Sequence, residues 1–303
     1  MESVLRVSAA EHRRLRRNYN WRRYATAYLF LLPNFIFFVI FLVIPFFWVF
    51  FLSFQEGGIL GPPQFVGLKN WRFILQDTVA RRTIFNTLYY MLMAIPTVFV
   101  ISMSLALILK RVVRGVGFIR AAIYFPTLSP VVLAALLWIF VVHPDFGILN
   151  FLTRSLGLET INWLGSGTAL PTIAMLEVWR GIGFWTMLFL AALLGLPQEL
   201  YDAAKIDGAS NLAQFRYITL PLLRPIFVFA FVMATIFNFQ LFDSVLILTD
   251  GGPQHQTATI VWYIYKNTFQ FSKPGVGAAM SFLMLVMILC LTLIQMYLLR
   301  RGR

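Results

Sequence analysis

Six long stretches of apolar residues dominate the chain, and short polar segments separate them. A helix needs about 20 mostly apolar residues to cross a bilayer, and each stretch is at least this long. Membrane β-strands are about 10 residues long and alternate apolar with polar positions, whereas these stretches are longer and do not alternate. The pattern therefore predicts an all-α integral membrane protein with six transmembrane helices, at about 24–54, 83–109, 118–142, 172–196, 222–248 and 276–299.

The composition agrees with this pattern. Of the 303 residues, 59% are hydrophobic and 12% are charged, and the mean hydropathy is +0.77. A soluble domain carries about 25% charged residues, so an ordinary soluble globule is excluded. Disorder is excluded as well, because it requires low hydrophobicity. The single cysteine, Cys290, cannot form an intramolecular disulfide, and we expect it to be a small packing residue.

The positive charges predict how the helices are oriented. The formal net charge is +13. With the basic tail 1–23 inside, 17 of the 25 Lys and Arg residues lie on the inner side and seven on the outer side, and Arg180 falls within a span. This excess places both termini, including the tail 301–303, in the cytoplasm, although the first outer loop carries four cations. The basic tail abuts a span, so we expect it to face the lipid bilayer rather than a nucleic acid.

The polar segment 197–221 reads as a short helix, a glycine break and a second short helix. Pro197 suits the first turn of a helix, Gly208 can adopt the positive φ that ends one, and Ser210 can cap the next. A cytoplasmic segment with this much local order is a candidate docking surface for another subunit. An amphipathic connector lying on the lipid would show the same pattern, and physical reasoning alone leaves both interpretations open.

The same segment resembles the EAA signature of permease subunits in binding-protein-dependent ABC importers. The signature consists of Glu-Ala-Ala, two residues, Asp-Gly-Ala, and then an apolar helix with Leu-Pro. Asp202 stands where the family usually has Glu, so the carboxylate is kept on a side chain one methylene shorter. The resemblance implies that the residues at the signature positions couple the chain to an ATPase. These residues are Asp202, Ala203, Ala204, Asp207, Gly208, Ala209 and Phe215.

Other motifs extend the resemblance over nearly the whole chain. Residues 65–71 (FVGLKNW) are similar to the first external loop of carbohydrate-importer permeases, and residues 144–150 (PDFGILN) to the exit of their third span. Residues 248–253 (LTDGGP), after Phe242 and Asp243, are similar to an element near the end of their fifth span. Together these motifs identify a permease of the maltose type, and the last one favours the first, maltose-F-like, member of the permease pair.

The resemblance implies a mechanism and a set of partners. The six-helix permease domain would cover 24–300, with the coupling loop 197–221 seated in a cleft of a cytoplasmic ATPase subunit. The partners would be a second permease subunit, two ATP-binding subunits and an extracytoplasmic solute-binding protein, at the inner membrane of a prokaryote. The ATPase subunits would use ATP and Mg. The chain itself is expected to bind no cofactor and to be a transport subunit rather than an enzyme, because it contains no Gly-Lys pair and hence no Walker phosphate loop.

Polar residues inside the spans are candidates for the substrate path, since ionisable groups in a membrane are costly and often functional. Glu177 and Arg180 lie three residues apart, so they share a helix face. They could form an ion pair that only fixes packing, or a polar wall beside aromatic rings that suit a sugar. Amides in span five could equally form interhelical hydrogen bonds. The predicted path residues are Thr127, Glu177, Arg180, Gly181, Phe184, Phe237, Asn238, Gln240 and Asp243.

Several alternatives remain open at this point. Glu177 paired with Arg180 suits a neutral sugar, whereas an uncompensated Arg180 suits a phosphate, as in a glycerol-phosphate-type permease. An ATP-independent secondary transporter would show an inverted repeat, and no clear repeat is visible. A membrane enzyme would need a catalytic constellation, and none is visible. A metal site is not expected, because the three histidines lack a second ligand at zinc spacing.

Overall fold

The computed structural model describes residues 24, 26–57, 62, 64–111 and 115–300. The chain divides into two compact units, 1–52 and 53–303. The described part of the first unit contains the apolar helix Thr26–Leu52, which lies within the predicted span 24–54. Its middle is a π-helical turn, Val39–Val43, and its last part is α2, Ile44–Leu52.

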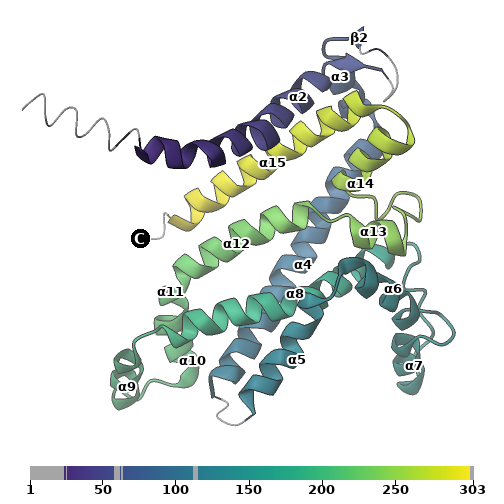
Figure 1. Ribbon diagram of the computed structural model, residues 1–303. Helices are drawn as coiled ribbons and strands as arrows, with labels where there is room; N and C mark the ends of the chain where they lie inside the picture. Colours follow the sequence, from purple (N-terminus) through teal and green to yellow (C-terminus); the bar gives the residue numbers. More distant parts are fainter. Residues whose placement is uncertain (1–23, 25, 58–61, 63, 112–114, 301–303) are drawn as a thin grey trace, which may run out of the picture. The chain divides into compact units, whose positions relative to one another are not determined.

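The second unit is a helical bundle built around α4 and α8, which pack along each other (Figure 1). Helix α5 packs against α8, and α12 packs against both α4 and α15. Phe99 of α4 sits at the centre of the core, with edge-to-face contacts to Trp185, Phe189 and Phe231 from α8 and α12. The bounds of these helices are Thr78–Arg111 (α4), Val116–Leu128 (α5), Ala169–Leu194 (α8), Arg224–Phe239 (α12) and Pro274–Arg300 (α15).

Shorter elements connect the long helices. Strands β1 (Gln55–Glu56) and β2 (Gln64–Phe65) pair antiparallel, with Gln55 opposite Phe65. Helices α3, α14 and α15 pack together beside them. The remaining bounds are Lys69–Gln76 (α3), Val131–Val141 (α6), Ile148–Ser155 (α7), Gln198–Ile206 (α9), Asn211–Gln214 (α10), Phe215–Thr219 (η2), Leu220–Leu222 (α11), Asp243–Leu248 (α13), Ile260–Tyr265 (α14) and Lys266–Gln270 (η3).

Prolines divide two of the candidate spans. Helices α5 and α6 meet at 98°, and the break falls at Ser129 and Pro130. Ser129 is extended, with φ −71° and ψ 133°, because the ring of the following proline disfavours the helical region for the preceding residue. A second bend, of 66°, separates residues 211–222 from α12, which has Pro225 in its first turn. Among the described residues, four helices are long and apolar enough to span a membrane, or six if each bent pair is one span.

The segment 222–248, predicted as one helix, has a break that the sequence pattern did not indicate. Helix α12 ends at Phe239 and α13 begins at Asp243. The hydroxyl of Thr259 donates a hydrogen bond of 2.8 Å to the carbonyl of Leu241, which satisfies a backbone acceptor in the break. A non-helical stretch inside a membrane protein is tolerated where protein groups bond its backbone or where it lines a cavity.

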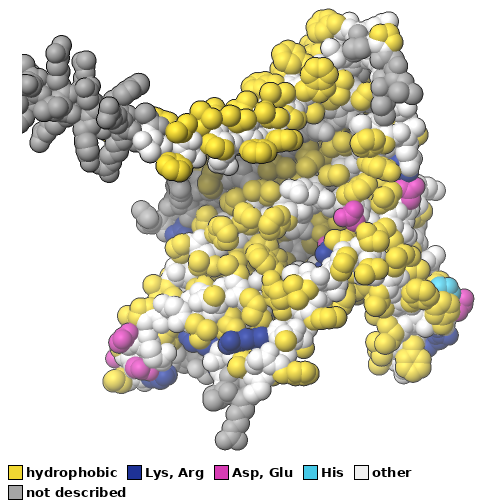
Figure 2. Space-filling model, viewed as in Figure 1, with side chains coloured by type: hydrophobic (Ala, Val, Ile, Leu, Met, Phe, Trp, Pro, Cys, Tyr) yellow, Lys and Arg dark blue, Asp and Glu magenta, His cyan; other side chains and the backbone are white. Residues whose placement is uncertain are grey.

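Cys290 differs from expectation, because its side chain is exposed on α15 rather than packed inside. An apolar side chain gains little by moving from lipid into a membrane protein's interior, so hydrophobicity alone does not predict burial here. Figure 2 shows the same effect on a larger scale, with hydrophobic side chains covering much of the outer surface over α8 and α12.

A buried asparagine fixes the loop that follows α13. Asn86 of α4 donates hydrogen bonds to the carbonyls of His255 and Ala258, at 2.8 and 2.9 Å. The hydroxyl of Thr87, the next residue, accepts a bond of 3.1 Å from the backbone N–H of Ile260. These contacts hold the start of α14 against the bundle and so help to position the break before α13.

We predict that Asn86→Ala destabilises the second unit. The substitution leaves one buried and one part-buried carbonyl without their donor, which costs about 2–3 kcal/mol. The apparent melting temperature of the detergent-purified protein, followed by tryptophan fluorescence, should fall by roughly 4–10 °C. Gln76→Ala, at an exposed position of α3, is the matched control and should change it little. Equal melting temperatures for the two variants would contradict the role given to Asn86.

Candidate functional site

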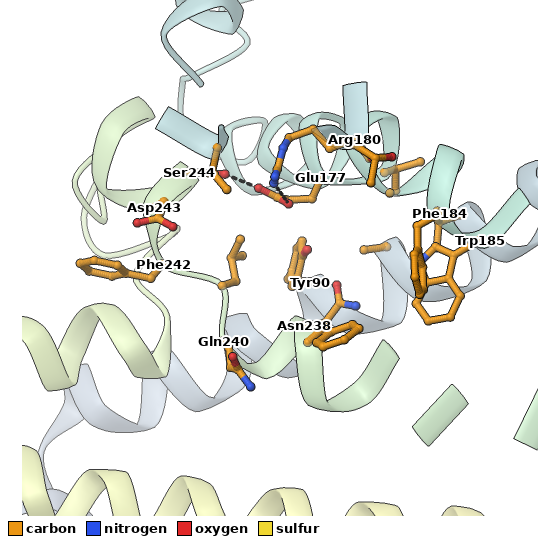
Figure 3. Close-up of a pocket in the computed structure, with 18 residues that line it drawn as sticks. Tyr90, Glu177, Arg180, Phe184, Trp185, Asn238, Gln240, Phe242, Asp243 and Ser244 are labelled. Carbon is orange, nitrogen blue, oxygen red and sulfur yellow. Dashed lines mark hydrogen bonds and ion pairs between the residues drawn. The ribbon is translucent and has the colours of Figure 1, made fainter. Parts of the chain in front are cut away.

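A pocket of about 450 Å³ lies where α4, α5, α8, the end of α12 and α13 come together (Figure 3). All nine residues that the sequence predicted for the substrate path line it. The complete lining is Tyr90, Ala94, Val98, Thr127, Val131, Glu177, Val178, Arg180, Gly181, Phe184, Trp185, Phe237, Asn238, Gln240, Leu241, Phe242, Asp243 and Ser244. Residues from α4, α5, α6, α8, α12 and α13, and from the break between the last two, therefore converge on one pocket.

Glu177 is the most connected polar group of the pocket. One carboxylate oxygen lies 3.0 Å from a guanidinium nitrogen of Arg180, and both side chains are largely buried, at 19% and 16% exposure. The other carboxylate oxygen accepts a hydrogen bond from the hydroxyl of Ser244 (Figure 3). The ion pair lies within α8, so it is the bond to Ser244 that ties α8 to the first turn of α13.

Arg180 keeps unused donors although it is paired. Its Nε is buried and has no hydrogen-bond partner among the described residues. Its backbone carbonyl accepts a 2.7 Å hydrogen bond from the hydroxyl of Thr127, which lies on α5 just before the bend. A buried guanidinium N–H without a partner costs free energy, so a bound molecule that accepts from it would relieve this cost.

Aromatic side chains form a second part of the lining. Phe184 and Trp185 meet edge to face, with ring centroids 4.9 Å apart. Phe237 is half exposed, and Phe242 packs against Tyr265 at 5.0 Å. Figure 3 shows Tyr90 between Glu177 and Asn238. Rings beside hydrogen-bonding groups can receive a molecule that has both apolar faces and polar edges.

The wall from α12 and the break carries amides and one carboxylate. Asn238 donates a 2.8 Å bond to the carbonyl of Ala234, four residues earlier, so its amide oxygen remains available. Gln240 and Asp243 are exposed to the pocket. Helical spacing is not what aligns Gln240 with Asp243, because the chain leaves the helix between them. The break itself brings both residues to the pocket.

Sequence reasoning did not identify Tyr90 and Ser244 as pocket residues. Tyr90 lies within an apolar stretch of α4 and is 2% exposed, so it resembles a core aromatic residue. Ser244 follows Asp243, and a hydroxyl in a membrane helix usually bonds its own backbone. Only the fold shows that Ser244 reaches Glu177 across 67 residues of sequence. Within the described residues, no group of three or more His, Cys, Asp or Glu side chains could hold a metal ion.

The predicted coupling residues lie on a separate surface, at the end of α8 away from α13 (Figure 1). The segment has the helix–glycine–helix form that the sequence predicted. Helix α9 ends before Gly208, which has φ +74°, and the hydroxyl of Ser210 caps α10 by accepting from the N–H of Ala213 at 3.3 Å. Asp202, Ala203, Asp207 and Gly208 are exposed, whereas Ala204, Ala209 and Phe215 are partly buried.

Asp202 is held in its charged form. Hydrogen bonds from Lys205 at 3.0 Å and from Gln198 at 3.3 Å lower the pKa of this carboxyl below its usual value. The Asp202–Lys205 pair is exposed to solvent, so its contribution to stability is small. Its effect is instead to fix the direction of a carboxylate on an exposed helix.

Comparisons with known proteins place the chain in one family. Residues 79–303 match the family described as the inner membrane component of binding-protein-dependent transport systems. The trehalose/maltose transport system permease protein MalF of Thermococcus litoralis is 32% identical over 278 residues, which cover 91% of this chain and 94% of that protein. The arabinooligosaccharides transport system permease protein AraP of Bacillus subtilis is 30% identical, with 90% and 88% covered.

Solved structures show the same fold. A bacterial ABC transporter involved in the import of the acidic polysaccharide alginate has a chain that matches with a TM-score of 0.82. The match covers 95% of this chain and 99% of that one, at 24% sequence identity. The all-α fold and its membrane helices are therefore those of an ABC importer permease, as the sequence predicted.

We predict that Gly183 is required for the close contact between α5 and α8. A Cβ at this position would lie 2.6 Å from the hydroxyl of Thr127 and 2.7 Å from the carbonyl of Ile123. Gly183→Ala should therefore destabilise the protein by about 1–3 kcal/mol. Gly181→Ala is the matched control, because its Cβ meets other atoms only at 3.5 Å or more. Melting temperatures of the two purified variants test the difference, and a control as unstable as Gly183→Ala would contradict the prediction.

Proposed function

The chain belongs to the family of inner membrane components of binding-protein-dependent transport systems, and we propose that it carries a neutral carbohydrate across the membrane in an ATP-driven importer. The relatives named above are permease proteins for trehalose/maltose and for arabinooligosaccharides. The observation that carries the proposal is the pocket, which combines aromatic rings with amides, a hydroxyl and an ion pair in the middle of the bundle.

The charges of the pocket favour a neutral substrate over a glycerol phosphate. Arg180 is paired with Glu177 at 3.0 Å, so its positive charge is already compensated. The one further charge among the described lining residues is the carboxylate of Asp243. A phosphate would meet no free cation here and would be repelled by Asp243, whereas sugar hydroxyls can donate to the carboxylates and accept from the amides.

Helix α9 and the turn at Gly208 are proposed to couple the chain to a separate ATPase. Exposed carboxylates on this segment lie beside exposed apolar side chains, of which Ile206 is 87% and Leu212 is 75% exposed. Apolar side chains that are this exposed in a polar segment are more stable in contact with a partner protein than in contact with water. Closure of the ATPase subunits, which would use ATP and Mg, would then shift the permease between inward-open and outward-open states.

The complete importer would contain this chain, a second permease subunit, two ATP-binding subunits and an extracytoplasmic solute-binding protein. Both termini would lie in the cytoplasm, which would put α9 on the same side as the ATP-binding subunits. A secondary transporter, the rival class, would use an ion gradient and would leave the exposed surface of α9 without a partner.

We predict ATP-dependent uptake of neutral sugars, such as trehalose and maltose, by the importer reconstituted in proteoliposomes. Glu177→Gln should reduce uptake by about tenfold or more, because it weakens the bond to Ser244 and leaves Arg180 uncompensated inside the bundle. Glu159→Gln, at an exposed carboxylate outside the pocket, is the control. Uptake by the chain without ATPase subunits would contradict the importer, and preferential uptake of glycerol 3-phosphate would contradict the neutral substrate.

We predict that Gly208→Val uncouples ATP hydrolysis from transport. Gly208 has φ +74°, and a non-glycine residue in this left-handed region costs roughly 1–2 kcal/mol per residue, or more when it is β-branched. The turn after α9 should therefore distort, and substrate-stimulated ATPase activity should fall.

Gly157 provides an unusually close control for this experiment. It has the same φ of +74°, and a Cβ at either glycine would meet nothing within 4 Å. Gly157→Val therefore introduces the same backbone strain after α7, away from the proposed coupling segment. Equal ATPase stimulation in the two variants would overturn the coupling role of α9.

A further inference from the structure

A second cavity, of about 420 Å³, lies under the proposed coupling segment. The last turn of α4 and the end of α8 form one side of it, and α9, α10 and η2 form the other. Both α4 and α8 are candidate membrane spans, and the cavity lies at their ends, where such spans would leave the apolar part of the bilayer. Figure 2 shows Lys and Arg side chains at this lower end of the molecule, with Asp and Glu side chains beside them.

The lining of this cavity is basic. Lys110, Arg111 and Lys205 contribute to it, and no carboxylate does so among the described lining residues. Lys205 is bonded to Asp202 at 3.0 Å. Within the described chain, no ion pair is formed by Lys110 or Arg111. Two cations therefore remain to attract a negative charge.

Lys110 is held in place by an aromatic ring. Its ammonium nitrogen lies 4.6 Å from the centre of the Tyr201 ring, and a cation–π contact orients a cation but does not neutralise it. Tyr201 is itself fixed, since it is buried and its hydroxyl lies 2.9 Å from that of Thr219. Thr219 in turn donates to the carbonyl of Gln214 at 3.3 Å. The site is therefore preorganised around Lys110.

We propose that this cavity binds a phosphate-bearing anion, held by Lys110 and Arg111 with help from Lys205. Two kinds of molecule could supply this phosphate group, namely the headgroup of an anionic phospholipid and free inorganic phosphate. Basic pockets between membrane helices at the cytoplasmic surface attract anionic headgroups, and each Lys or Arg contributes about a few-fold in affinity. Donors around the anion include the two cationic side chains and the amide of Asn211.

A bound anion would join the ends of α4 and α8 to α9 and α10. It would therefore hold the helix–glycine–helix segment against the bundle. The site does not depend on which substrate the central pocket carries, so the proposal can be tested independently of the transport assay.

The test measures thermal stabilisation of the purified full-length chain, in complex with its transport partners, in detergent. The probes are dioleoylphosphatidylglycerol, dioleoylphosphatidylcholine and inorganic phosphate. Phosphatidylglycerol should raise the melting temperature and the zwitterionic lipid should not. In Lys110→Gln/Arg111→Gln, the phosphatidylglycerol concentration for half-maximal stabilisation should rise about tenfold or more. The single variant Lys110→Arg keeps the positive charge, so it should retain most of the stabilisation by phosphatidylglycerol that the wild type shows.

Arg216→Gln is the matched control, because Arg216 is also an exposed cation near a tyrosine ring, 5.9 Å from Tyr217, but lies outside the cavity. Its stabilisation by phosphatidylglycerol should equal that of the wild type. Stabilisation by inorganic phosphate that requires Lys110 and Arg111, without an effect of the lipid, supports the site and identifies free phosphate as its ligand.

The proposal is overturned if neither probe distinguishes the double variant from Arg216→Gln. If the double variant assembles poorly, Arg111→Gln alone carries the test, since its side chain is exposed and the substitution leaves the packing of α4 intact. An unchanged lipid and phosphate response in that variant would equally overturn it.

Discussion

A carboxylate buried inside a membrane protein is costly unless it is paired, and the way Glu177 is paired organises the central pocket. Arg180 on the same helix supplies one partner, and Ser244 at the start of α13 supplies the other. The second bond is possible because the chain breaks after Phe239 and turns α13 towards α8. Without a partner on α13, one oxygen of this buried carboxylate would have no hydrogen bond, which is costly in a low-dielectric interior.

The break also requires support from the opposite side. Thr259 bonds the carbonyl of Leu241, and Asn86 of α4 bonds two carbonyls in the loop before Thr259. The pocket is therefore held by a chain of polar contacts that runs from α4 through the loop to α13, and then to Glu177 of α8. Helix α8 continues from Glu177 to the second cavity at Leu193, so one rigid element connects both polar regions of the bundle.

The structural features that could be predicted from the sequence are those determined by neighbouring residues in the chain. Gly208 and Ser210 are local signals, and they defined the end of one helix and the start of the next. The polar residues predicted for the substrate path all line the pocket, and they could be singled out because polar groups are rare in apolar spans. Tyr90, Ser244 and the break at 240–242 could not, since each depends on contacts with residues far away in sequence. Cys290 shows a further limit, because lipid and protein interior are equally apolar.

The break between α12 and α13 allows part of the pocket lining to be substituted at little cost in stability. Gln240 lines the pocket, is exposed and lies outside the α-helices, so a new side chain at this position has little packing or helix propensity to lose. Residues on α8, by contrast, are constrained by packing on α4 and α5. Selection for a transporter of a different sugar would therefore find its least costly substitutions at Gln240, which makes this residue the natural starting point for engineering specificity.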